Sequence, residues 1–179
     1  MPEYIPGLEQ NPQPLLERLF SGIAAREMRT LPFYRPQIPI RACDFQLFEQ
    51  QWIGALLTPW MLSLLVLPGP GQLWPRRSAG TRLALALPCG NVGFTLGEIA
   101  GFPPCGSDTN PLGGSDACGQ YLSSSLMSPL PAELAAEPAL ILAQQCVRMA
   151  LALPVRDADA PENMHRRWLL TRVKGRTDA

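Results

Sequence analysis

Near each end of the chain, apolar residues recur at the spacing of one face of an α-helix. The first set lies at three- and four-residue intervals and consists of Leu15, Leu16, Leu19, Phe20 and Ile23. Asn11 is the expected cap of this helix, with Pro12 or Pro14 in the first turn. A second helix is expected from about Glu137 to Leu151, because Pro138 suits its first turn and apolar residues follow at helical spacing.

Between these helices, several segments carry apolar residues at every second position, which is the period of a β-strand, and two others are short apolar runs bounded by turn residues. The expected strands are Arg41 to Phe48, Trp52 to Thr58, Met61 to Leu67, a hairpin formed by Leu83 to Leu87 and Val92 to Leu96, and Gln120 to Met127. Pro88-Cys89-Gly90-Asn91 supplies the turn of the hairpin. Trp168 to Lys174 is expected to add a final edge strand, whose basic side chains discourage aggregation.

Strands joined by hairpin-length connections, with one helix before them and one after, predict an α+β fold. The expected architecture is a two-layer sandwich, in which an antiparallel sheet is packed on one side by the N- and C-terminal helices. We expect one domain over residues 1–179, with a flexible loop at about 102–119. A chain of this length can bury a core of useful size without help from a metal or a disulfide.

The 26 residues from Gln50 to Pro75 contain no charge. A membrane span needs about 20 consecutive apolar residues, but Pro59 interrupts this run and Pro68-Gly69-Pro70-Gly71 ends it. Proline removes a backbone donor that hydrocarbon cannot replace. The run therefore predicts two core strands joined by a tight Pro59-Trp60 corner, with no stable membrane insertion.

Composition narrows the classes of function. Lys and Arg together number 15, as do Asp and Glu, so no global charge favours nucleic acid as a partner. The N-terminus lacks the basic and apolar regions of a secretory signal, which predicts a cytoplasmic protein. His165 and Lys174 are the only residues of their kinds, so we expect neither an enzyme nor a bound cofactor. Glu98 is isolated among apolar residues and is expected to face solvent at a strand end.

Five cysteines are scattered along the chain without a CxxC pair. Cys43, Cys89 and Cys146 fall in or beside regular segments and are expected to be small buried apolar residues. Cys105 and Cys118 instead bound a loop rich in Gly, Ser and Pro. A redox or half-metal site formed by these two thiols stays open as an alternative function.

Aromatic and methionine side chains on the expected sheet are candidates for binding a partner, because aromatics anchor interfaces and methionine adapts to varied apolar surfaces. The candidates are Trp52, Pro59, Trp60, Met61, Trp74 and Met127. On strands such residues more often belong to the core. Two tryptophans beside Pro/Gly corners favour a surface role, since corner residues seldom reach the centre of a core.

Four blocks of the sequence resemble successive blocks of the HybE/HupJ/HoxT family of [NiFe]-hydrogenase assembly chaperones. They read FEQQWIGALLTPWMLSLLVLPGPGQLWP, LALPCGNVGFTLGE, GQYLSSSLMSPL and CVRMALALPV. The resemblance runs from about Pro12 to the basic C-terminal segment. Compared with the family pattern, this chain inserts roughly a dozen residues after Glu98, including both loop cysteines, a length that surface loops tolerate.

The resemblance implies an α+β fold similar to that of type III secretion chaperones. It also implies a cytoplasmic, non-catalytic maturation factor without a cofactor, acting on a membrane-linked uptake hydrogenase. The implied partner is the small-subunit precursor with its twin-arginine signal peptide; the large subunit and a rubredoxin-like protein are further candidates. A thiol-dependent redox or cluster-protection factor using Cys105 and Cys118 remains the alternative, and a membrane-anchored accessory protein is a third hypothesis.

Overall fold

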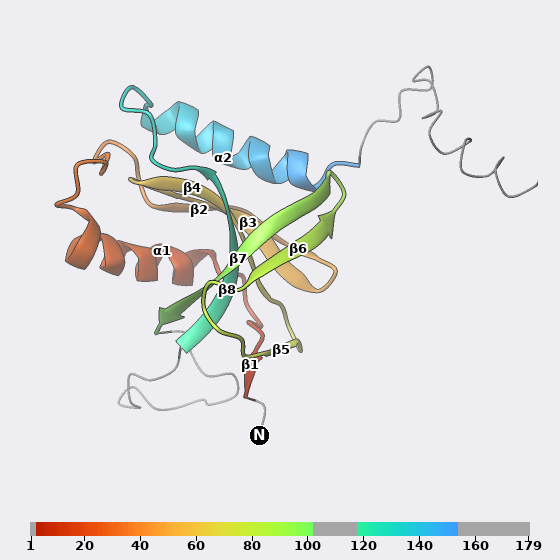
Figure 1. Ribbon diagram of the computed structural model, residues 1–179. Helices are drawn as coiled ribbons and strands as arrows, with labels where there is room; N and C mark the ends of the chain where they lie inside the picture. Colours follow the sequence, from red (N-terminus) through yellow and green to blue (C-terminus); the bar gives the residue numbers. More distant parts are fainter. Residues whose placement is uncertain (1–2, 102–117, 154–179) are drawn as a thin grey trace, which may run out of the picture.

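A computed structural model describes residues 3–101 and 118–153 (Figure 1). In chain order the elements are β1 (Tyr4–Pro6), α1 (Gln13–Ile23), the π-helical turn η1 (Ala24–Met28), β2 (Arg41–Phe48), β3 (Gln51–Thr58), β4 (Met61–Pro68), β5 (Leu73–Pro75), β6 (Arg82–Leu87), β7 (Gly90–Ala100), β8 (Cys118–Met127) and α2 (Ala136–Leu151). The predicted helices and strands that fall in these ranges are confirmed to within a few residues. The predicted strand Trp168 to Lys174 and most of the 102–119 loop lie outside the described residues.

Six strands form one antiparallel sheet in the order β2-β3-β4-β8-β7-β6. β3 and β4 make a continuous ladder from Gln51↔Pro68 to Thr58↔Met61, and β8 enters between β4 and β7. β1 and β5 form a separate two-stranded sheet that the alternation pattern did not predict. Three-residue strands are too short to show a period, and their pairing joins segments about 70 residues apart in the chain.

The two helices lie on opposite faces of the sheet (Figure 1). α1 buries Leu16 and Phe20 in a cluster with Leu56 of β3 and Leu65 of β4. α2 buries small side chains, Ala139, Ala143, Val147 and Ala150, in a second cluster on the other face. The predicted α+β class, an antiparallel sheet packed by the N- and C-terminal helices, is confirmed.

The arrangement of layers differs from the prediction in one respect, because the helices do not share one side of the sheet. β3 and β4 are apolar on both faces, and a strand buried on both faces reads as a continuous apolar run. One helix on each side of the sheet buries these apolar side chains. Most of the charge-free run thus forms two inner strands of the sheet. No helix in the described ranges is long and apolar enough to cross a membrane.

Side chains and backbone together close the predicted corner at Pro59-Trp60. The Thr58 hydroxyl accepts a hydrogen bond from the Met61 N–H at 3.1 Å and donates to the Met61 carbonyl at 3.2 Å. The predicted cap of α1 is displaced by one residue. Pro12 occupies the N-terminal cap position and Asn11 lies before it, but the Asn11 side chain still accepts a hydrogen bond from the Gln13 N–H at 3.0 Å.

The three cysteines whose side chains the structure describes differ in burial. Cys43 is buried and Cys146 is partly buried, as expected, whereas Cys89 is exposed at the two-residue turn between β6 and β7. The prediction that Cys89 is buried is wrong because its alternating neighbours end at Leu87, and the turn carries the thiol beyond the core.

Candidate partner-binding surfaces

Three of the six predicted binding residues are buried. Trp52 is 9% exposed and its indole N–H donates to the Leu8 carbonyl at 2.8 Å. Trp60 is 7% exposed and stacks on Tyr34 with a ring-centroid distance of 6.2 Å. Pro59 beside it is also buried. These side chains stabilise the α1 side of the sheet, as the core interpretation of strand aromatics anticipates.

The other three residues keep some accessible surface. Met61 is partly buried against the cluster on the α1 side, whereas Trp74 and Met127 are partly buried against the cluster on the α2 side. The structure therefore does not gather the six predicted residues on one surface. Their role in binding stays a prediction, which now rests on Met61, Trp74 and Met127 as the accessible members.

Trp74 is held by a relay of glutamine side chains. Its indole N–H donates to Oε1 of Gln51 at 3.0 Å, and the Gln51 amide donates to Gln72 at 3.1 Å. Gln72 in turn donates to Oε1 of Gln50 at 2.7 Å. The relay joins β5 to the turn between β2 and β3, so the indole has a fixed position beside the α2-side core.

Glu98 has partners that the sequence did not reveal. It lies inside β7, where its carboxylate accepts from the Gln120 side chain at 2.7 Å and pairs with Arg76 at 3.3 Å. Gln120 is 1% exposed, and its amide also bonds both the N–H and the carbonyl of Arg77. Glu98 is exposed near the end of β7, as expected, but it is not isolated, because its cross-strand partner is a buried amide.

The two edge strands of the large sheet differ in whether side chains bond their outward-facing backbone groups. β2 is the first edge strand. α1 side chains bond the backbone groups that β2 turns away from β3. Glu17 accepts the Ala42 N–H at 3.1 Å, while Gln13 donates to the Ala42 carbonyl and accepts the Phe45 N–H. Asn11 donates to the Phe45 carbonyl at 3.1 Å. A bulge between Cys43 and Gln46 further interrupts this edge.

β6 forms the other edge. The Leu96 N–H donates to the Thr81 carbonyl at 2.8 Å, and the register continues with Arg82↔Thr95 and Leu83↔Phe94. Because hydrogen-bonded and non-hydrogen-bonded pairs alternate along an antiparallel ladder, the N–H and C=O groups of Arg82, Ala84 and Ala86 point away from β7. No described residue bonds them.

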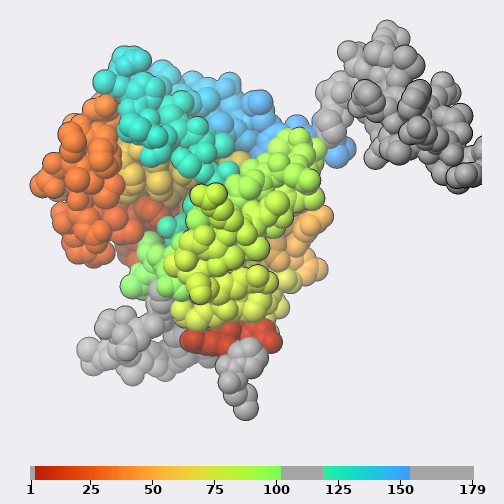
Figure 2. All heavy atoms as spheres, in the orientation of Figure 1, coloured from red at the N-terminus to blue at the C-terminus, as the bar shows by residue number. Residues whose placement is uncertain are grey.

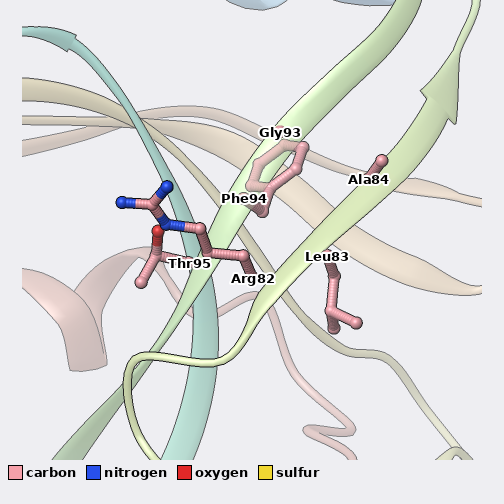
Figure 3. A pocket seen from close by; sticks show the side chains of 6 residues that line it. All are labelled: Arg82, Leu83, Ala84, Gly93, Phe94 and Thr95. Atoms are coloured by element: carbon pink, nitrogen blue, oxygen red, sulfur yellow. The ribbon is translucent and has the colours of Figure 1, made fainter.

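An open hollow of about 420 Å³ lies over the hairpin beside this edge (Figure 3). It is lined by Arg82, Leu83, Ala84, Gly93, Phe94 and Thr95. Arg82 and Thr95 are register partners and extend to the same side of the hairpin, where the small Ala84 and Gly93 form the next pair toward the turn. Figure 2 shows the hairpin at the surface on this side.

Sequence reasoning found this hairpin but missed its position at an unprotected edge. The available signal was that the exposed positions of β6 after Arg82 are both alanine. Lysine or proline is what proteins commonly place on an edge strand. Edge position itself depends on the order of strands in the sheet, which no local pattern encodes.

The thiol alternative is not tested by the structure. Cys105 lies outside the described residues, and Cys118 is described only through its backbone, which pairs with Ala100. Burial, together with the charges of Asp44 and Glu17, raises the pKa of the Cys43 thiol to about 11. Across residues 3–101 and 118–153, no three His, Cys, Asp or Glu side chains gather in a metal-binding group.

An α+β sheet with one capped edge, one open edge and a fixed tryptophan beside its core defines a protein suited to binding another polypeptide. The comparisons with known proteins agree with this class. The family model described as "[NiFe]-hydrogenase assembly, chaperone, HybE" matches residues 11–172. The chain belongs to this family, whose members are non-catalytic assembly chaperones.

Individual relatives cover nearly the whole chain. The Hydrogenase-2 operon protein HybE of Escherichia coli K12 is 40% identical over 175 residues, which is 98% of each chain. The hydrogenase expression/formation protein HoxT of Azotobacter vinelandii is 26% identical over 86% of this chain and 90% of its own. The solution structure of HybE from Escherichia coli matches with a TM-score of 0.65, 40% identity and 91% coverage of both chains.

Proposed function

We propose that this protein is a cytoplasmic maturation chaperone for a membrane-linked [NiFe] uptake hydrogenase. It binds the immature small subunit through the apolar core of its twin-arginine signal peptide and holds it until cofactor insertion is complete. The large subunit and a rubredoxin-like protein are further proposed partners. The observation that carries the proposal is the family match over residues 11–172, because it extends over all the described elements from α1 to α2.

Within the chain, the proposed contacts are Met61, Trp74 and Met127, which combine apolar character with accessible surface. Trp74 is suited to an anchor role because Gln51 fixes its indole while part of the ring stays accessible. The two methionines provide flexible side chains that adapt to different apolar segments. Trp52, Pro59 and Trp60 are buried and are not among these contacts.

Co-purification tests this function directly. A tagged small-subunit precursor is expressed with the chain, with and without its signal peptide, beside a tagged large subunit. We expect capture of the complete precursor and a loss of at least tenfold when the signal peptide is removed. Equal capture of both forms of the small subunit would place the interface on its mature part, and capture of the large subunit alone would contradict the proposal.

A variant with both Cys105 and Cys118 changed to serine serves as the control for the thiol hypothesis. If the chaperone function proposed here is right, this variant captures the precursor and supports hydrogenase maturation like the unchanged chain. Normal capture with abolished maturation would instead favour thiol chemistry.

A further inference from the structure

We propose that the outer edge of β6 pairs strand to strand with an extended apolar segment of the client. This inference rests on the proposed function and adds to it the place and the mode of binding. A peptide that joins a sheet edge gains affinity from main-chain hydrogen bonds and specificity from alternate side chains. The edge offers both kinds of contact.

The first argument is the contrast between the two edges of the sheet. β2 is blocked by a bulge, by the side chain of Asn11 before α1 and by those of Gln13 and Glu17 in α1. Asp44 within the bulge also pairs with Arg148 at 3.9 Å. Proteins commonly block edges in such ways because unpaired strand backbone recruits other chains. Along β6, beyond the charge of Arg82 at its start, none of these devices occurs among the described residues. One edge of the same sheet is therefore protected and the other is available.

The second argument is that both faces of the β6–β7 hairpin can accept side chains from a strand added at this edge. On one face, Leu83 and Leu85 are partly buried against the α2-side cluster, as Trp74 is. Apolar side chains of an incoming strand would extend this cluster and cover more of both leucines. On the other face, the hollow over Ala84 and Gly93 has room for one bulky side chain reaching across from the new strand.

Charge restricts which part of the client pairs. Arg82 is exposed at the start of the edge and has no acidic partner among the described residues. A basic residue directly opposite it would be repelled. The paired segment is therefore an alternately apolar stretch without a basic residue, about six residues long to match β6, and the twin arginines of a signal peptide lie outside it.

A second copy of this chain fits the edge less well. Antiparallel pairing of β6 with itself would bring only Arg82, Ala84 and Ala86 of the partner copy to the face that carries the hollow. None of the alanines can fill it, and side-chain packing across strands is what stabilises such pairs. The hollow therefore favours a client segment with a large apolar side chain.

Amide hydrogen exchange of the full chain tests the pairing residue by residue, using a synthetic peptide of the small-subunit signal sequence as the probe. In the free chain, the N–H groups of Arg82, Ala84 and Ala86 are expected to exchange fast, and those of Leu83 and Leu85 slowly. On binding, we expect at least tenfold slowing at the first three only. A peptide that binds and leaves these three amides unchanged overturns the inference while the proposed function stands.

The remaining outcomes are equally decisive. If neither the peptide nor the complete precursor binds, the proposed function and this inference fall together. If the three amides are already slow in the free chain, the edge is occupied without a client and the inference is wrong. Sedimentation at several concentrations then shows whether a second copy or the chain itself covers the edge.

Two variants check the same edge by affinity. Ala86→Pro removes one outward N–H and no bond to β7, so we expect peptide binding to weaken about tenfold, while the matched Ala86→Val keeps the N–H and binds within about twofold. Gly93→Leu keeps every backbone group and fills the hollow, so it is also expected to weaken binding. Circular dichroism confirms that each variant is folded. Unchanged affinity in both folded test variants would contradict the pairing.

Discussion

Gly7 passes so close to Gly69 that a Cβ atom on Gly7 would lie 1.8 Å from the Gly69 carbonyl oxygen. The contact lies where β1 and β5 pair, and the Gly7 N–H donates to the Gln72 carbonyl beside it at 2.8 Å. Backbone packed against backbone cannot yield as a flexible side chain can. The two glycines therefore fix the N-terminal strand against the PGPGQLWP segment.

Gly7→Ala is expected to lower the free energy of unfolding by about 1 to 3 kcal/mol, because the added methyl group forces a backbone shift in a packed region. Urea denaturation followed by circular dichroism measures the change. Gly93→Ala is the matched control, since nothing lies within 4 Å of a Cβ there, and it should change stability by less than about 0.5 kcal/mol. Equal effects of the two substitutions would refute the close approach.

Trp60→Ala is expected to destabilise the protein by about 3 to 5 kcal/mol, the range for removing a large buried aromatic side chain. The stacked Tyr34 ring would lose its partner at the same time. Trp60→Phe keeps an aromatic ring and should lose clearly less. Thermal unfolding of the unchanged chain, Trp60→Ala and Trp60→Phe measures these losses of stability. A stable Trp60→Ala protein that fails only in client capture would show that the binding role, rather than the core role, dominates.

Gln13→Ala combined with Glu17→Ala is expected to uncover the β2 edge. The N–H groups of Ala42 and Phe45 lose their acceptors, which costs about 1 to 3 kcal/mol for each donor left unsatisfied in a buried setting, and less where water enters. The exposed edge should also promote self-association. Light scattering at several protein concentrations measures this, with Arg18→Ala on the same helix as control. A double variant that stays as monodisperse as Arg18→Ala would argue that this capping is unimportant.

Cys43 is expected to make stability fall as the pH rises above about 9. Burial raises its pKa from 9.0 to about 11 in the folded chain, so between these values the unfolded thiol releases its proton while the folded thiol keeps it. The unfolded state then binds fewer protons, and stability falls by at most about 1.4 kcal/mol per pH unit.

Urea titrations of the unchanged chain and of Cys43→Ala, repeated from pH 7 to pH 11, test this linkage. The difference between the two unfolding free energies should be constant below about pH 9 and should shrink above it. Contributions from Tyr121 and Cys146, whose pKa values are also raised by burial, cancel in that difference to first order. A difference that does not change with pH would contradict the raised pKa of Cys43.

The course of the chain was largely predictable, because strands and helices depend on local spacing and on turn residues. Trp52 to Thr58 and Met61 to Leu67 were identified by their apolar content and by Pro59 and Pro68, and the structure extends each strand by one residue. The positions of the site residues were less predictable. Trp60 and Trp74 look alike in the sequence, yet one is stacked in the core and the other is held at its margin by Gln51.

By itself, the sequence determined the α+β class, the ends of most elements and the family, since these follow from short-range patterns and from motifs read in order. Tertiary structure alone decided that the helices cover opposite faces, that Glu98 meets Gln120, and that β6 is an open edge while β2 is capped. Each of these depends on pairing between segments far apart in the chain. Such pairing is set by how apolar faces find cover in three dimensions, a property that no local window of sequence contains.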